Sequence, residues 1–280
     1  MRIPTTWLYV PSVDECIMRK AIASSTDVVI FDLEDSVPEC EKNNARNNVK
    51  KVFNDNKKEK LSCVRINAIS TAEGIADLLF LRENNICPDY ILLPKASVEK
   101  DSWFVGSFLE VFEKPPKIFI LIETVSSFME LRSVVNKPDY LYGVFFGSAD
   151  FSADLCVNPS NNDFKWARQE ITLHANRLNM PAIDTPFFNI YDREANIRHA
   201  QQARDMGFVG IQLIHPKQLD DIKFSFSLEK SHYQEIMASI DDASEKGDCA
   251  VQRFNNHVFG PPLVRYIRNV EKLMGDNNAD

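Results

Sequence analysis

The segment DVVIFDLED, residues 27–35, combines the two features from which the fold of this chain can be predicted. Its first half is a continuous apolar run of the kind that forms a parallel strand buried on both faces. Its second half places Asp32, Glu34 and Asp35 within four residues, where the strand would end. Carboxylates in such a place are costly unless a cation or a hydrogen-bond donor lies opposite them. We therefore expect cationic partners elsewhere in the chain.

Seven further apolar runs follow the same pattern and alternate with segments of helical character. The runs are 5–11, 61–68, 89–95, 117–124, 140–150, 180–188 and 208–216. The helical segments include 38–53, 70–83, 126–135, 164–178 and 193–206. Eight strand–helix units are typical of a (β/α)8 barrel, whereas a doubly wound open sheet would begin with a Gly-rich turn that this sequence lacks. We predict an α/β fold, a TIM (β/α)8 barrel, over residues 1–222.

The C-terminal part of the chain, residues 223–280, is too long to form only the eighth helix of the barrel. It holds two helical patterns, at 231–247 and at 263–274. We predict a C-terminal helical extension that folds over a barrel mouth or packs on a neighbouring subunit.

Composition narrows the class of protein and its partners. The chain has 280 residues, 44% hydrophobic and 26% charged, which suits a large globular domain, and its net charge of -8 argues against a nucleic-acid binder. Six scattered cysteines indicate reduced thiols and a cytoplasmic location. No run approaches the roughly 20 apolar residues of a membrane span, and the N-terminal apolar segment is too short for a signal peptide. We expect small-molecule or protein partners, with no nucleic acid and no membrane.

Polar residues gather where the predicted strands end, and in a TIM barrel these ends form the active site. They are Asp32, Glu34, Asp35, Arg65, Asn67, Lys95, Glu123, Thr124, Ser148, Asp150, Asp184, Thr185, Gln212 and His215. Carboxylates that converge on one mouth are tolerable if they bind a hard divalent cation and pair with Arg65 and Lys95. Two direct carboxylates, with others holding water, suit Mg²⁺. Arg65 then offers its planar fork to a substrate carboxylate or an enolate oxygen.

For several strand-end residues a structural role is favoured. We expect Asp32, Asp184 and Asp192 to be helix caps or halves of salt bridges. His215, which precedes a proline, is expected to anchor a loop. Lys95 has the residue type of a Schiff-base lysine, but the nearby acids favour an ion pair.

A set of short motifs runs across residues 6–220. It comprises LYVP, DVVIFDLEDSVP, VRIN, LLPK, LIET, GSADFSADL, PAIDTPF and IHPKQ, together with Lys42 and the AR pairs at 45–46 and 167–168. As a set these motifs resemble the HpcH/HpaI aldolase and citrate lyase superfamily. Within it, the sequence is most similar to the citrate lyase β-subunit-like acyl-CoA lyases.

The resemblance implies a magnesium-dependent carbon–carbon lyase. Such an enzyme cleaves a 3-hydroxyacyl thioester, such as citramalyl-, malyl- or citryl-CoA, into acetyl-CoA and a 2-oxoacid, or runs the reverse condensation. By the same resemblance Glu123 and Asp150 hold Mg²⁺, Arg65 polarises the oxoacid or enolate oxygen, and Glu34 and Asp35 hydrogen-bond metal-bound water. It also implies a homo-oligomer, with a trimer favoured.

Three positions depart from the family pattern. Thr5 stands where the family often has an Arg that we associate with the CoA end of the site, and Cys156 stands where many members have Gly. In the stretch 255–267, Phe259 falls where relatives carry an Asp that is delivered to a neighbouring subunit for proton transfer. Loss of such a group typically costs about 10²–10⁴ in rate. Two alternatives therefore stay open: a CoA-independent 2-oxoacid aldolase, and a catalytically weak metal- or oxoacid-binding subunit of a lyase complex.

Overall fold

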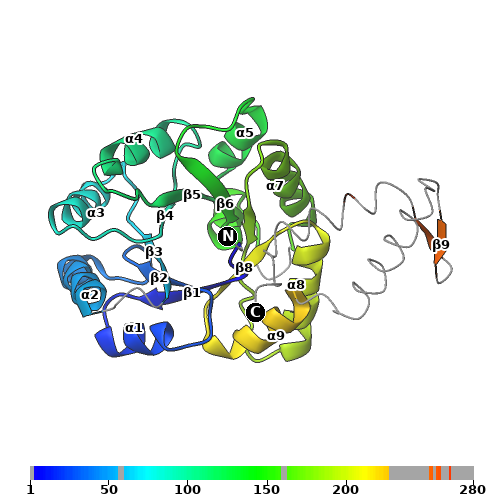
Figure 1. The fold of residues 1–280 in the computed structure, drawn as a ribbon, viewed down its shortest axis with the longest axis horizontal. Helices are drawn as coiled ribbons and strands as arrows, with labels where there is room; N and C mark the ends of the chain where they lie inside the picture. Colours follow the sequence, from blue (N-terminus) through cyan, green and yellow to red (C-terminus); the bar gives the residue numbers. More distant parts are fainter. Residues whose placement is uncertain are drawn as a thin grey trace, which may run out of the picture.

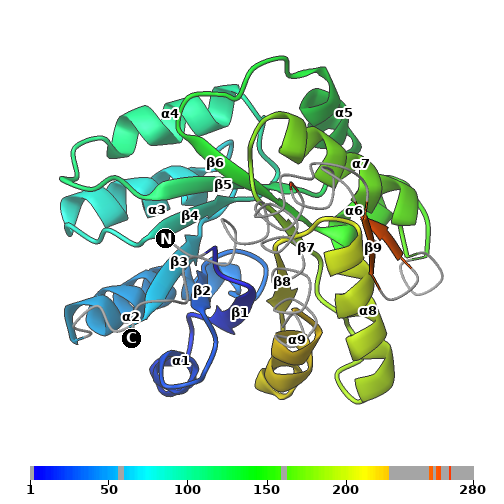
Figure 2. The ribbon, with the colours of Figure 1, turned by 45° about the vertical axis from the view of Figure 1, so that its right-hand side comes forward.

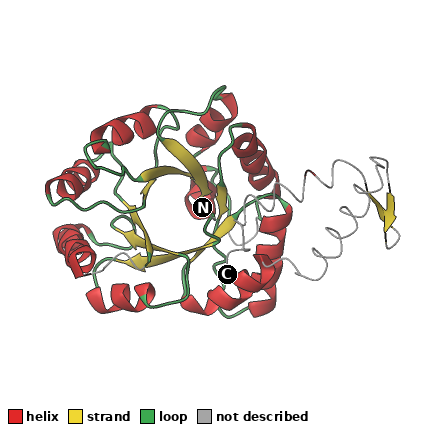
Figure 3. Ribbon diagram, viewed as in Figure 1, coloured by secondary structure: helices red, strands yellow, loops and turns green. Residues whose placement is uncertain are grey.

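Eight parallel strands close into a barrel in the order β1 to β8, with β1 pairing to β8 (Figure 1). The computed structural model describes residues 3–55, 60–158 and 163–226, the strand residues 252–254 and 257–259, and Arg265. Helices surround the barrel on the outside, as the colours of Figure 3 show. The predicted TIM (β/α)8 barrel is confirmed.

All eight strands lie within the predicted apolar runs. They are β1 Thr6–Pro11, β2 Val28–Asp32, β3 Leu61–Arg65, β4 Tyr90–Leu93, β5 Lys117–Ile122, β6 Leu141–Phe146, β7 Ala182–Asp184 and β8 Gly210–Leu213. The predicted runs are longer than the observed strands. The difference is clearest at β7, which covers only three residues of the run 180–188. The run 140–150 was wrong at its end, because β6 stops at Phe146 and a helix follows.

The helices alternate with the strands, except that two helices, α6 and α7, lie between β6 and β7 (Figure 2). They are α1 Glu15–Ile22, α2 Lys42–Asp55, α3 Ala72–Glu83, α4 Lys100–Leu109, α5 Val125–Ser133, α6 Ser148–Asp154, α7 Lys165–Arg177, α8 Arg193–Asp205 and α9 Leu219–Phe226. Asp150 therefore lies in the first turn of α6 rather than at a strand end. Asp192 caps α8, where its side chain accepts the Ala195 N–H at 3.0 Å, as predicted. In the described part of the chain, every helix is too short or too polar to cross a lipid bilayer.

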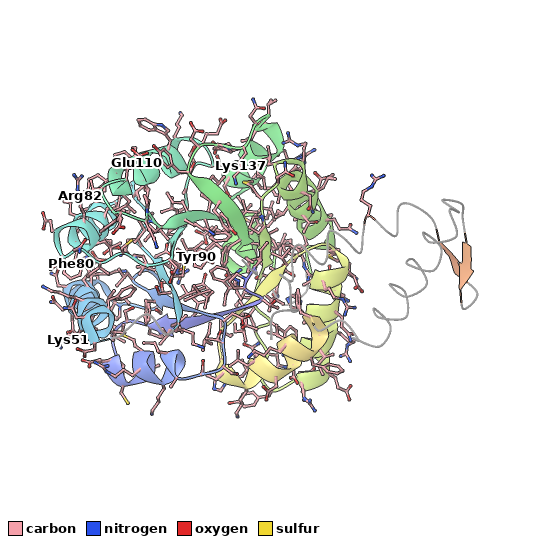
Figure 4. The ribbon with its side chains drawn as sticks, viewed as in Figure 1. Lys51, Phe80, Arg82, Tyr90, Glu110 and Lys137 are labelled. Carbon is pink, nitrogen blue, oxygen red and sulfur yellow. The ribbon has the colours of Figure 1, made fainter. Side chains whose placement is uncertain are left out.

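The strands are apolar on both faces because each face packs against a separate core. The outer face packs against the helices, and the inner face fills the barrel with side chains. Trp7 lies among the inner rings, with its centroid 4.9 Å from that of Tyr90 and 5.0 Å from that of Phe145 in edge-to-face contacts. Figure 4 places Tyr90 inside the barrel and Arg82 on an outer helix. The barrel is thus a packed core, and its chemistry is confined to the strand ends.

The predicted C-terminal extension lies mostly outside the described residues. This holds for the helical pattern at 231–247 and, apart from Arg265, for that at 263–274. Two short strands are described, β9 Gln252–Phe254 and β10 His257–Phe259, which pair in antiparallel fashion. Helix α9 runs through the predicted domain boundary at residue 222 to Phe226. The division into barrel and extension stays a prediction.

Candidate active site

An Arg–Asp pair joins the carboxyl ends of β2 and β3. Asp32 and Arg65 are neighbours in the register of the two strands. Arg65 Nε donates to Asp32 Oδ1 and Nη2 donates to Oδ2, both at 2.7 Å. Asp32 also accepts the N–H groups of Glu34 at 3.0 Å and Ser36 at 3.1 Å. Burial alone would raise the pKa of Asp32, but Arg65 and these donors lower it below its usual range. The predicted salt-bridge role of Asp32 is confirmed.

The remaining acids of the β2 segment face two cations. Arg65 Nη1 lies 3.1 Å from Glu34 Oε2 and 3.3 Å from Asp35 Oδ2. Lys95 Nζ lies 2.8 Å from Glu34 Oε1 and 3.6 Å from Asp35 Oδ1. Burial works against the charge of Lys95, but Glu34 and Asp35 raise the pKa of its amine above the usual value. A firmly protonated amine is a poor Schiff-base nucleophile, so the predicted ion pair is confirmed.

Tyr9, on β1, packs against the flat face of the Arg65 guanidinium, with its ring centroid 4.9 Å from Arg65 Cζ. Its hydroxyl donates to Gln212 Oε1 at 3.0 Å. Gln212 Nε2 in turn donates to the carbonyls of Phe146 at 2.8 Å and Asp184 at 2.9 Å. Sequence reasoning missed Tyr9, although the alternation of side chains along β1 points this position to the barrel interior.

Glu123, directly after β5, is 1% exposed and has one carboxylate oxygen in use. The Lys95 N–H donates to Oε1 at 2.7 Å, while Oε2 has no hydrogen-bond partner among the described residues. Burial, together with the charges of Glu34 and Asp150, raises the pKa of Glu123 to about 9. Gly147 leaves room for this carboxylate, because a Cβ there would lie 3.1 Å from Oε2 and 2.7 Å from the Glu123 Cβ.

Lys95 presents its N–H to Glu123 from a strained backbone conformation. Its φ of +49° lies in the left-handed region, which side chains other than Gly and Asn seldom adopt. Such outliers persist where the surrounding structure over-determines them, as the contacts of Lys95 with Glu34 and Glu123 do here. The turn after β4 thus contributes both a backbone donor and an ammonium to the cluster.

Glu123 and Asp150 are near enough for the charge of Asp150 to raise the pKa of Glu123, and both offer oxygen donors of the type that a hard divalent cation takes. Oε2 of Glu123 has no hydrogen-bond partner among the described residues, and the pKa of Glu123 is raised first by burial and then by the charges of Glu34 and Asp150. In the part of the chain that is described, no three His, Cys, Asp or Glu side chains gather as a metal site. Two carboxylates that leave the other positions to water and substrate are what Mg²⁺ commonly accepts.

The profile of the HpcH/HpaI aldolase/citrate lyase family matches residues 5–216. The chain belongs to this family. Citramalyl-CoA lyase, mitochondrial, from Rattus norvegicus is 30% identical over 288 residues, covering 95% of this chain and 84% of the rat protein. The predicted family is therefore confirmed.

Two solved structures from Mycobacterium tuberculosis share the architecture. Protein CitE in complex with magnesium, acetoacetate and coenzyme A has a TM-score of 0.81 at 24% identity, covering 99% of this chain and 100% of the other. The citrate lyase β subunit complexed with oxaloacetate and magnesium has a TM-score of 0.68 at 27% identity, covering 80% and 97%. The first likeness supports the barrel fold, and the second comes from a family member crystallised with an oxoacid and a metal.

The structure places two of the departures from the family pattern. Thr5 precedes β1 and donates its N–H to Asp27 Oδ2 at 3.0 Å, so it lies at the amino end of the barrel. The carboxylate cluster lies at the opposite strand ends, and the association of the Thr5 position with the CoA end of the site stays a prediction. Cys156 follows α6 with φ +56°, a left-handed conformation that Gly adopts most readily. The side chain of Phe259 lies outside the described residues.

A second Arg–Asp pair lies at the end of β7. Arg168 Nε donates to Asp184 Oδ2 at 3.0 Å, and both side chains are fully buried. Asp184 also accepts the N–H of Thr185 at 2.8 Å, which confirms its predicted structural role. The Thr185 hydroxyl lies 2.6 Å from that of Ser148, at the start of α6. His215 anchors its own loop, since its Nδ1 accepts the Lys217 N–H at 3.1 Å, as predicted.

Proposed function

We propose that this protein is a Mg²⁺-dependent carbon–carbon lyase. It cleaves a 3-hydroxyacyl-CoA of the citramalyl-, malyl- or citryl-CoA type into acetyl-CoA and a 2-oxoacid, or catalyses the reverse condensation. The observation that carries this proposal is the buried Glu123, with a free oxygen and a pKa of about 9, beside Asp150 and a preorganised Arg65. The name of the rat relative and the oxoacid and magnesium in the M. tuberculosis complex support it.

Glu123 and Asp150 would hold the metal, which supplies Lewis acidity toward the 2-oxoacid oxygen when bound. Glu34 and Asp35 would accept hydrogen bonds from water around it, because both face the same mouth. Lys95 limits the repulsion among these acids and keeps Glu123 oriented through its backbone N–H. The chain thus separates direct ligands from acids that orient water.

Cleavage requires a hydrogen-bond donor that stabilises the negative charge developing on the substrate. The C3 hydroxyl loses its proton and becomes the oxo group, the C2–C3 bond breaks, and its electron pair moves into the thioester as an enolate, which takes a proton at C2. Arg65 stays protonated, since Asp32 raises the pKa of its guanidinium despite burial. Asp32 holds its edge and Tyr9 holds its face, so Nη1 is aimed before the reaction begins.

Other parts of the prediction stay proposals. The CoA-independent 2-oxoacid aldolase stays an alternative, favoured by the Thr5 and Phe259 departures. The catalytically weak binding subunit also stays an alternative, because the family resemblance implies a proton-transfer acid where this chain has Phe259. We further propose a homo-oligomer, with a trimer favoured. The cytoplasmic location also stays a proposal, as the rat relative is named mitochondrial.

The test is release of a 2-oxoacid from citramalyl-CoA and malyl-CoA by the full-length protein with Mg²⁺. We expect release that is lost with EDTA and in Glu123→Gln. Glu130→Gln is the matched control, because Glu130 also accepts a backbone N–H, that of Val98 at 2.9 Å, but on the outer helix α5. Release that persists in EDTA contradicts the metal role. Mg²⁺-dependent oxoacid binding without turnover on any thioester favours the binding subunit.

A further inference from the structure

Lys42 begins α2 outside β2 and β3 (Figure 1), and its ammonium is buried beneath the acid segment of the site. Its Nζ donates to the carbonyl of Leu33 and the carbonyl of Glu34, both at 2.8 Å. A third bond, at 2.6 Å, goes to Oδ1 of Asn67. An ammonium has three protons, so each has an acceptor.

A second layer of buried polar groups holds Lys42 in place. Asn67 donates from its backbone at 2.8 Å and from Nδ2 at 2.7 Å to Asp77 Oδ2. Arg46 Nη1 lies 2.8 Å from Asp77 Oδ1 and 2.7 Å from Glu73 Oε2. Lys42, Asn67, Asp77 and Arg46 are each less than 9% exposed. A buried network whose members find partners is rigid and costly to rearrange.

This network determines the path of the backbone that carries Glu34. The Leu33 N–H donates to the carbonyl of Arg65 at 2.9 Å, and the Leu33 carbonyl accepts from Lys42 and from Asn67 Nδ2. The Glu34 N–H donates to Asp32, and the Glu34 carbonyl accepts from Lys42 and from a later N–H of its turn. Leu33 and Glu34 therefore each have both their N–H and their carbonyl in a hydrogen bond.

We propose that Lys42 is a positioning residue for the active site. It holds the segment of Glu34 and Asp35 against the end of β3, so that these acids meet Arg65 and Lys95. Its own bonds go to backbone carbonyls and an amide, so it acts through the acids rather than on substrate. The significance for catalysis rests on the proposed function, but the positioning itself is independent of it.

The chain offers a matched control in Lys60. Its Nζ donates to two backbone carbonyls, of Ser24 at 2.9 Å and Thr26 at 2.7 Å, at the amino end of the barrel. Lys60→Met therefore removes a lysine with similar contacts, at the opposite end from the acid cluster. Lys42→Met removes the charge and the three donors beneath the site.

The first measurement is hydrogen–deuterium exchange of the full-length, metal-free protein, read by mass spectrometry over the peptide containing residues 33–37. We expect Lys42→Met to speed exchange there by about tenfold or more, because bonds to a charged donor limit local opening. Lys60→Met should leave that peptide unchanged. Unchanged exchange in Lys42→Met overturns the proposal. Should Lys42→Met not fold, Asn67→Ala carries the same test, since it removes an acceptor of Lys42 and a donor to Leu33.

The second measurement separates positioning from general stability. At equal folded fraction, we expect Lys42→Met to weaken Mg²⁺ binding by calorimetry and to lower kcat more than it raises KM for the acyl-CoA. Lys60→Met should change neither. Faster exchange with unchanged Mg²⁺ binding and kcat would assign Lys42 a structural role only and overturn the proposal. If the wild type turns over no thioester, the proposed function fails, while exchange and Mg²⁺ binding still decide the role of Lys42.

Discussion

Two buried Arg–Asp pairs lie at the ends of parallel strands, and only one of them adjoins the cluster of charged side chains in the candidate active site. Arg65 meets Asp32 at the ends of β3 and β2, and Arg168 meets Asp184 at the end of β7. In both pairs the arginine donates through Nε and Nη2 to the carboxylate. Both pairs thus use the same two arginine nitrogens, although Arg65 divides its bonds between Oδ1 and Oδ2 while the shorter bonds of Arg168 both go to Oδ2. These bonds do not reveal which pair is functional.

The surroundings of the third guanidinium nitrogen differ. Nη1 of Arg65 lies within 3.1 Å of Glu34 and 3.3 Å of Asp35 at the mouth of the barrel. Nη1 of Arg168 is buried and has no hydrogen-bond partner among the described residues. A buried pair alone is weak evidence of function or of stability. What distinguishes Arg65 is that its third nitrogen faces two additional carboxylates at the mouth of the barrel.

The largest expected effect separates the two pairs by stability. Arg168→Met should lower the free energy of unfolding by about 3–5 kcal/mol, because it leaves a buried carboxylate without its cation. Arg65→Met should cost less, since Asp32 keeps the N–H groups of Glu34 and Ser36, and since burial raises the pKa of Glu34 so that it takes up a proton more readily. Urea denaturation of the metal-free proteins at pH 6 measures both losses.

Arg132→Met is the control for that comparison, because Arg132 is a half-exposed arginine whose ion pair with Glu170 is long, at 3.5 Å. It should change the free energy of unfolding by less than about 1 kcal/mol. A loss in Arg65→Met equal to that in Arg168→Met would remove the distinction between the pairs.

The next effect is a pH dependence of the free energy of unfolding, and it arises in the acid cluster around Arg65. The pKa of Glu123 is about 9 in the folded protein, against an ordinary value of 4.5. Between these pH values the folded protein binds a proton that the unfolded chain has released, so stability falls as pH rises. One proton gives a slope of at most about 1.4 kcal/mol per pH unit. Metal-free Glu123→Gln should lack this component in urea titrations from pH 5 to 9.

Glu130→Gln, on the outer helix α5, should keep the wild-type slope. Saturating Mg²⁺ should flatten the wild-type curve, because a bound cation favours the charged carboxylate. Parallel curves for wild type and Glu123→Gln would show that Glu123 titrates at its ordinary pKa.

The smallest expected effect concerns the contacts through Tyr9 and Gln212 that connect the Arg65–Asp32 pair with the Arg168–Asp184 pair. The Tyr9 hydroxyl bonds Gln212, whose Nε2 donates to the Asp184 carbonyl, while the Tyr9 ring covers Arg65. Tyr9→Phe should cost about 0.5–1.5 kcal/mol of stability, the net value of one hydrogen bond, and leave kcat within about threefold. Tyr9→Leu, which also removes the ring, should lower kcat further. A fall of kcat in Tyr9→Phe as large as in Tyr9→Leu would assign the hydroxyl a part in turnover.

The strands of the barrel were predictable because both faces of each are buried, which leaves a continuous apolar run in the sequence. The end of β6 was not. The run 140–150 continues past Phe146 into α6, where Phe151 is also buried, and periodicity does not separate a short strand from the buried turn that follows it.

The site was predictable to a different extent. Glu34, Asp35 and Arg65 could be grouped because a barrel brings its strand ends together, and the structure confirms that they meet. Tyr9 and Lys42 could not be assigned to the site from the sequence. Tyr9 contributes through the contact of its ring with the Arg65 guanidinium, and Lys42 through its hydrogen bonds to two backbone carbonyls. Such contacts leave no pattern in a single sequence.

From the sequence alone one could determine the barrel, the inventory of acids and cations at its mouth, and the family. Only the tertiary structure decided that Asp32 belongs to Arg65 while Asp184 belongs to Arg168, and that one oxygen of Glu123 finds no hydrogen-bond partner in the described part of the chain. The reason is physical. The free energy of a charge depends on its burial and on neighbours a few ångströms away, and folding assembles those neighbours from distant parts of the chain.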